Sequence, residues 1–151
     1  MVDALEGDGL VAEDANGTPV GLLTWIVGAA GSGPDEAEVR VLVVEEGARG
    51  RGVGTALLHA AEAELRRAAV RRAWLLTTND NTDGLAFYQR RGWRLAELHP
   101  GAVDEARASL KPAIAAVGSN GIPIRDELVL RRELESADPG RGTGRATPAG
   151  R

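Results

Sequence analysis

The chain has 151 residues, of which 43% are hydrophobic and 26% are charged, and this composition is ordinary for one globular domain with a substantial core. It contains no cysteine, which excludes disulfides, a thiol nucleophile and cysteine-ligated zinc. The formal net charge of −4 argues against nucleic acid as the main partner. The N-terminus is acidic and no apolar stretch could span a bilayer, so we expect a cytoplasmic protein without a membrane partner.

The first part of the chain predicts an antiparallel meander of three strands. Residues 10–13 form a short strand, and the Asn-Gly pair at 16–17 is a turn signal. Residues 20–27 alternate between two faces, as a second strand does. Residues 36–44 form a third strand, which is apolar and rich in β-branched residues.

A glycine-rich loop connects the third strand to a predicted helix that begins near Val53 and carries apolar residues at a spacing of four. The first turn of a helix leaves N–H groups unpaired at the positive end of the helix dipole, and glycine lets an anion approach them. Strand, loop and helix therefore predict an anion site. Its candidate residues are Arg49, Gly50, Arg51, Gly52, Val53, Gly54 and Thr55.

Three kinds of phosphate-binding loop compete for this segment. A Walker loop needs a Gly-Lys pair, and the only lysine of the chain is Lys111. A dinucleotide loop needs a third glycine where this chain has Leu57. The third pattern, Arg/Gln-x-x-Gly-x-Gly/Ala, is matched at every position by residues 49–54.

In residues 49–54 the chain resembles the GNAT superfamily of acetyl-CoA-dependent N-acetyltransferases. The resemblance implies that the loop amides hold the pyrophosphate of coenzyme A, and that Val43 and Val44, at the end of the strand, also contact this co-substrate. The alternative is a glycine-rich turn with solvated arginines.

The second half of the chain predicts two more strands around a short helix. Residues 73–78 form a strand parallel to residues 36–44, because a helix connects the two. A polar turn can cap a helix over residues 85–91, which Gly92 ends. Residues 93–98 form the next strand.

The C-terminal third predicts an insertion before the last strand. Residues 103–110 are helical and are ended by Pro112, and residues 127–134 form the final strand. Residues 135–151 are rich in Gly, Pro and Arg and are expected to be disordered. We therefore expect one domain over residues 1–134.

Residues 81–93 carry a second resemblance to the same superfamily, to its N-x-x-A-x-x-x-Y-x-x-x-G-F segment. The departures are Gly84 in place of Ala and Trp93 in place of Phe. The resemblance implies that Asn81, with neighbouring Asn79, contacts the co-substrate and that the hydroxyl of Tyr88 protonates the departing thiolate. The alternative for Tyr88 is a packed core tyrosine.

The two motifs imply an α/β fold of the GNAT type. This fold has a mixed, mostly antiparallel sheet of about six strands, flanking helices and a parallel strand pair that splays near Val44. Almost nothing precedes the first hairpin, so we expect a version shortened at the N-terminus. The acceptor side is then open, or it is built from residues 99–126 or from a second subunit in a homodimer.

The chemistry implied is direct attack of an amine on the thioester of acetyl-CoA. The N–H of Val44 would donate to the acetyl oxygen. Glu38 is interpreted as lying on the same alternating face as Arg40, Leu42 and Val44. It is the first candidate for the proton acceptor, and Glu45 is the second. The alternative for Glu38 is a solvated carboxylate at a strand end.

We therefore expect an N-acetyltransferase that acts on an amine of a small molecule or a peptide. No group of His, Asp and Glu has the spacing of metal ligands, so no metal is expected. A catalytically weak acyl-CoA-binding module that acts through a protein partner is the main alternative. A nucleotide-binding domain is the third interpretation.

Overall fold

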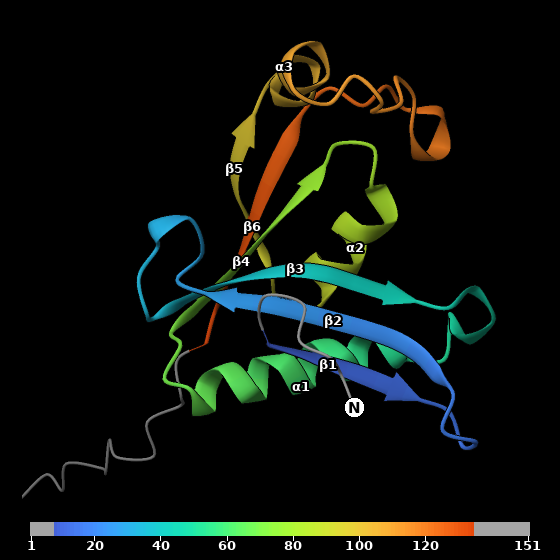
Figure 1. Cartoon of the computed structure of the whole chain (residues 1–151), viewed down its shortest axis with the longest axis vertical. Helices are drawn as coiled ribbons and strands as arrows, with labels where there is room; N and C mark the ends of the chain where they lie inside the picture. Colours follow the sequence, from blue (N-terminus) through green and yellow to red (C-terminus); the bar gives the residue numbers. More distant parts are fainter. Residues whose placement is uncertain (1–7, 135–151) are drawn as a thin grey trace, which may run out of the picture.

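The computed structural model describes residues 8–134, which form one six-stranded sheet with three α-helices (Figure 1). The predicted disordered tail, 135–151, lies outside the described residues. No helix in the described range is long and apolar enough to cross a membrane. The elements are β1 (Asp8–Glu13), β2 (Pro19–Val27), β3 (Glu36–Val44), α1 (Val53–Arg67), β4 (Arg72–Thr78), α2 (Thr82–Arg90), β5 (Arg94–His99), α3 (Ala102–Ser109) and β6 (Glu127–Glu133), with short 3-10 turns η1 (Ala29–Gly31), η2 (Glu46–Ala48) and η3 (Ser119–Gly121).

The strand order is β1-β2-β3-β4-β6-β5, and only β3 and β4 are parallel. The prediction of a mixed, mostly antiparallel sheet with one parallel pair is confirmed. A helical connection, α1, joins the parallel strands, as a crossover in one sheet requires. Bounds differ from the predicted ones by one to three residues, except for β3, which is as predicted.

The parallel pair is short. Residues 36–38 of β3 pair with residues 72–74 of β4, and the two strands then separate (Figure 1). In this view α2 lies in the angle between them. The predicted splay is confirmed, but it begins at Glu38, well before Val44. The result is an opening whose closed end lies at Glu38 and Trp74.

A β-bulge at Arg40 changes which side chains of β3 share a face. Val39 pairs with Trp25, whereas Val41 pairs with Thr24, so Arg40 has no partner on β2. Residues directly opposite in antiparallel strands lie on the same face, so the alternation of β3 shifts by one at the bulge. The prediction that Glu38 shares a face with Leu42 and Val44 is therefore wrong.

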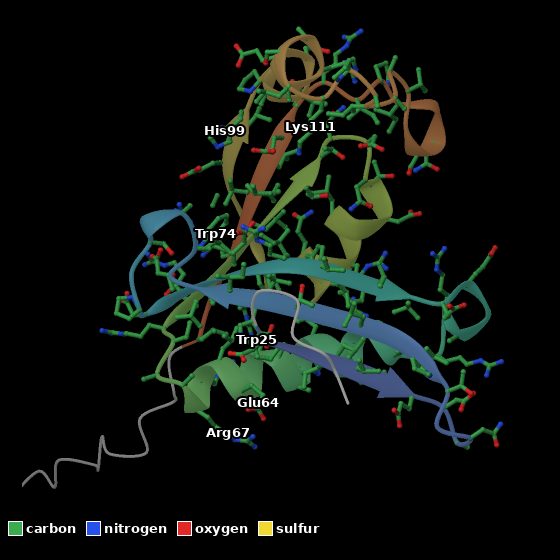
Figure 2. All side chains as sticks on the ribbon, viewed as in Figure 1. Trp25, Glu64, Arg67, Trp74, His99 and Lys111 are labelled. Carbon is green, nitrogen blue, oxygen red and sulfur yellow. The ribbon has the colours of Figure 1, made fainter. Side chains whose placement is uncertain are left out.

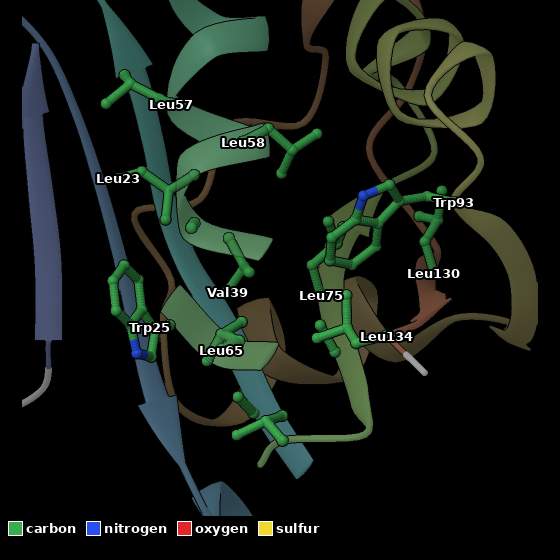
Figure 3. Close-up of a cluster of buried hydrophobic side chains, with 14 residues drawn as sticks. Leu23, Trp25, Val39, Leu57, Leu58, Leu65, Leu75, Trp93, Leu130 and Leu134 are labelled. Atoms are coloured by element: carbon green, nitrogen blue, oxygen red, sulfur yellow. The ribbon is translucent and has the colours of Figure 1, made fainter. Parts of the chain in front are cut away.

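The core lies between the sheet and the two helices α1 and α2 (Figure 3). Helix α1 packs on β1, β2 and β3. Side chains from both halves of the sheet meet there, because β4 and β6 contribute as well as β2 and β3. The largest fully buried side chains are Leu23, Leu58, Leu65, Trp93, Leu130 and Leu134.

One buried carboxylate connects α1 to the second half of the sheet. Glu62 is 4% exposed, and its Oε1 accepts a hydrogen bond of 3.0 Å from the indole N–H of Trp93. The guanidinium groups of Arg66 and Arg132 lie 3.9 and 3.7 Å from the same carboxylate. Burying a charge is costly unless it is paired and hydrogen-bonded, and Glu62 meets both conditions.

The segment that follows β5 is fastened to the end of β4. The amide of Asn79 accepts from the N–H groups of Arg125 and Asp126 at 2.9 and 3.0 Å and donates to the carbonyl of Pro123 at 2.9 Å. The carboxylate of Asp80, 7% exposed, accepts from the Thr78 hydroxyl and from the N–H of Ser119. These contacts hold residues 117–126 against the end of β4.

Removing the buried carboxylate should destabilise the fold. Glu62→Ala leaves the indole N–H and Arg132 without their partner, so we expect a loss of about 2–4 kcal/mol in the free energy of unfolding. Urea denaturation measures this loss. Glu64→Ala is the matched control, because Glu64 pairs with Arg67 on the exposed side of the same helix (Figure 2). Its effect should stay below about 0.5 kcal/mol, and equal losses in the two variants would contradict the role of Glu62.

Acid should release the segment that Asp80 holds. Burial acts to raise the pKa of Asp80, but hydrogen bonds from Thr78 and Ser119 outweigh it, so the pKa lies below its usual range. A lowered pKa stabilises the folded form above the ordinary carboxyl pKa of about 4, and this stabilisation is lost as the pH falls through the folded value.

Hydrogen exchange of the Ser119 region, scaled to the unfolded-chain rate at each pH, should therefore show protection that falls below about pH 4. In Asp80→Asn the protection should be low and independent of pH. Asp104→Asn, at an exposed residue of α3, should keep the wild-type profile. A wild-type profile in Asp80→Asn would show that the carboxylate does not hold the segment.

Candidate active site

The glycine-rich loop and the start of α1 enclose a hollow of about 290 Å³. Helix α1 begins at Gly52 without a side-chain cap and has no acidic residue in its first turn, so its first N–H groups are available to an anion. Gly50 and Gly52 have φ of 76° and 79°, which L side chains rarely adopt. The lining residues are Val44, Ala48, Arg49, Gly50, Gly52, Val53, Gly54, Thr55, Phe87 and Arg91.

Arg91, which was not among the predicted site residues, adds a fixed positive charge to this hollow. Its guanidinium donates to the Thr55 hydroxyl and, at 2.8 Å, to the carbonyl of Phe87, and it stacks 3.7 Å from the centre of the Phe87 ring. All these partners are neutral, and no carboxylate of the described residues pairs with Arg91. The sequence signal that could have identified this contact is an aromatic residue, Phe87, followed four positions later by Arg91 at the end of the predicted helix.

The two loop arginines lie in different places. Arg49 lines the hollow at the start of α1, and its Nε donates to the carbonyl of Val44 at 3.1 Å. Arg51 lines a neighbouring hollow together with Glu13, Asp14 and Glu45. Of the two arginines, Arg49 thus lines the hollow between the loop, α1 and Arg91, and Arg51 lines the neighbouring one.

Tyr88 lies on the helix side of the sheet, packed against the core. Its ring makes an edge contact with Phe87 at 5.2 Å and lies 5.8 Å from the ring of Trp93. Burial raises the pKa of Tyr88. The hydroxyl therefore stays protonated through the neutral range, and it makes no hydrogen bond within residues 8–134.

Glu38 lies at the closed end of the opening and on the outer face, away from the helices. It pairs with Trp74 in the last position of the parallel ladder. Its side chain is 12% exposed, and its Oε2 accepts from Nε of Arg40 at 3.1 Å. Oε1 has no partner in the described part of the chain.

Val44 is far from Glu38. Six residues of extended strand span about 20 Å, and the bulge places the two side chains on opposite faces. Val44 contacts the loop and α1 instead, and Glu45, the second candidate base, lies beyond it. Val43 is 55% exposed on the outer face. These three residues therefore lie at the loop end of the opening.

The two asparagines have structural partners. The amide of Asn79 is bonded to residues 123–126. Asn81 caps α2, because its Oδ1 accepts from the N–H of Gly84 at 3.1 Å, and its Nδ2 donates to Thr77 at 2.9 Å. A Cβ at Gly84 would lie 2.2 Å from Asn81 Nδ2, which explains why this position has no side chain.

Comparison with known proteins identifies the family and the fold. Residues 3–93 match the family model described as Acetyltransferase (GNAT) family. The Bacillus subtilis (strain 168) protein YxbD, described as uncharacterized, is 41% identical over 133 residues, which are 88% of this chain and 77% of YxbD.

Two solved structures share the fold. A Bacillus subtilis acetyltransferase in complex with CoA has a TM-score of 0.72 and 20% identity, over 85% of this chain and 78% of its own. A GNAT family acetyltransferase from Elizabethkingia anophelis with acetyl-CoA bound has a TM-score of 0.71 and 20% identity, over 84% and 76%. The chain belongs to the GNAT acetyltransferase family.

Removing the unbalanced charge of Arg91 should weaken the binding of coenzyme A. A hydrogen bond to a charged group contributes about 1.5–3 kcal/mol, so Arg91→Gln should raise the Kd of coenzyme A roughly 10- to 100-fold. Calorimetric titration at low and high salt should show the difference shrinking as salt screens the charge. Arg90→Gln, one residue earlier on an exposed position of α2, should bind like the wild type. Equal Kd values for the two variants would remove Arg91 from the site.

Proposed function

We propose that the protein transfers an acetyl group from acetyl-CoA to the nitrogen of an amine, by direct attack and without a covalent enzyme intermediate. The observation that carries the proposal is the placement of two sites on one opening. A hollow with uncapped amides and a free cation lies at one end, and a buried carboxylate with one free oxygen lies at the other. The two ends are about 20 Å apart along β3.

The residues at the loop end suit a phosphate-bearing co-substrate. The first amides of α1, Arg49 and Arg91 would hold the phosphates, and the edges of β3 and β4 that face the opening would hold the pantetheine arm. Acetyl-CoA would supply an activated thioester. The acceptor would be an amine of a small molecule or of a peptide.

Glu38 would accept the proton that the amine loses. Arg40 binds Oε2, which would orient the carboxylate and leave Oε1 without a partner among the described residues. A backbone N–H of residues 39–42 would donate to the acetyl oxygen, since this part of β3 has lost its pairing with β4 and lies next to Glu38. This replaces Val44 in that role.

Tyr88 would protonate the leaving sulfur. In the balanced step, the nitrogen bonds to the acetyl carbon, the carbon–sulfur bond breaks, Glu38 takes the amine proton and Tyr88 gives its proton to the sulfur. Glu38 lies on the outer face and Tyr88 on the helix face. Glu38 would thus act on the amine from one side of the sheet, and Tyr88 would act on the leaving group from the other.

One observation favours the alternative of a binding module that acts through a partner. Val41, Val43 and Leu76 are 39%, 55% and 43% exposed, and all lie on the outer face. Single exposed apolar residues are ordinary on protein surfaces, so this observation has less weight than the two sites on the opening.

Kinetics of Tyr88→Phe separate the two functions. Loss of a general acid should lower kcat roughly 100-fold or more while the affinity for acetyl-CoA stays constant. The assay measures coenzyme A release with an amine acceptor, and a thermal-shift titration measures binding. A thermal shift with ATP or NAD but none with acetyl-CoA would favour a nucleotide-binding domain. Acetyl-CoA binding without transfer to any amine would favour the binding module.

A further inference from the structure

A second hollow, of about 430 Å³, lies on the outer face over β4, β6 and β5. One wall comes from the connection between β2 and β3, which includes η1. Figure 2 shows Trp74 on β4 and His99 on β5. The lining residues are Ala29, Ala30, Ser32, Glu36, Trp74, Leu76, Glu97, His99, Glu127, Val129 and Arg131.

This hollow begins beside the closed end of the opening. Trp74 pairs with Glu38 in the parallel ladder, so both side chains lie on the outer face. From Trp74 the hollow extends along the sheet to Glu127, which pairs with Thr78. Trp74 and Thr78 are four residues apart on β4, which corresponds to about 13 Å. A molecule with its amine at Glu38 could therefore place its other end at Glu127.

The unbalanced charge of the hollow is negative. The ring of His99 lies 3.0 Å from the carboxylate of Glu97, and Arg131 donates to that carboxylate at 2.9 Å. The contact with His99 and that with Arg131 both lower the pKa of Glu97. Glu36 is paired with Arg72, which is bound to a further carboxylate as well. Glu127 has no ion pair or hydrogen bond from its side chain within residues 8–134. The guanidinium of Arg131 is thus balanced by Glu97, whereas the carboxylate of Glu127 has no partner among the described residues.

The remaining lining suits an organic cation rather than a hydrated ion. Trp74, Leu76 and Val129 form an apolar floor, and an indole face attracts organic ammonium groups.

We propose that this hollow binds the remote end of an acceptor that carries a second cationic group, roughly 10–15 Å from the amine that is acetylated, as strand spacing requires. The inference rests on the proposed function, since it places the acetylated amine at Glu38. Glu127 would pair with the second cation, and Trp74 would cover the chain between the two amines. The substrate class is therefore a linear diamine or polyamine.

Two matched probes test the substrate class with the wild-type protein. An eight-carbon linear diamine and octylamine share one chain length and differ only in the second ammonium group. We expect kcat/KM for the diamine to exceed that for octylamine roughly 10-fold or more, as a charged pair worth about 1.5–3 kcal/mol predicts. Equal values for the two amines would overturn the proposal while leaving acetyl transfer established.

A variant locates the effect. Glu127→Gln keeps the shape of the side chain and should raise KM for the diamine roughly 10-fold without changing KM for octylamine or the affinity for acetyl-CoA. Glu105→Gln, on an exposed position of α3, removes the same charge elsewhere and should behave like the wild type. An unchanged KM for the diamine in Glu127→Gln would overturn the proposed subsite.

A binding measurement keeps this inference separate from the proposed function. The diamine should raise the melting temperature of the protein in the absence of acetyl-CoA, and Glu127→Gln should abolish that shift. If no amine is acetylated although the diamine shift is present and needs Glu127, the proposed function fails and the cation subsite stands. If amines are acetylated and the diamine gives no shift that depends on Glu127, the subsite fails and the function stands.

Discussion

The separation of β3 from β4 after three paired residues is the constraint on which the rest of the structure depends. Elsewhere in the sheet, neighbouring strands satisfy each other's backbone groups along most of their length. Past Glu38 and Trp74 the facing edges have no strand partner. Unpaired backbone groups need another partner, so the opening favours an extended ligand that can hydrogen-bond to both edges. The loop hollow and the outer carboxylate then lie at the two ends of one path.

A sheet divided in this way needs a second connection, and the helix side provides it. Helix α1 packs on the first three strands, and its buried Glu62 binds Trp93 and Arg132 from the other half. Arg91 makes a similar link at the start of α1, where it joins α2 to Thr55. Both links lie on the helix face, so the outer face stays open along the same strands. The two faces can therefore have different tasks, support on one and acceptor binding on the other.

The sequence predicted most of the elements because local signals agree with the fold there. The β-branched run of β3, the glycine-rich loop and the spacing in α1 each point to the element that forms, and two motifs in order gave the family. The bulge at Arg40 could not be predicted, because a strand with one inserted residue has the same kind of composition as a regular strand. The insertion nevertheless moves the residues after it to the opposite face from the one that regular alternation predicts. The partners of Asn79 lie more than forty residues away in sequence, in a segment without a regular pattern. In the sequence Arg91 is one of several neighbouring arginines, and only the fold shows that its partners are neutral.

The bulge has a consequence for how such a strand can diverge among related proteins. If β3 alternated regularly over its whole length, Glu38 and Val44 would lie on one face, because they are six residues apart. The bulge places them on opposite faces. Replacements at the closed end can change the polarity of the outer surface without touching the packing of the loop against α1. One extra residue thus allows the exposed surface at the closed end to vary while the packing at the loop end stays fixed.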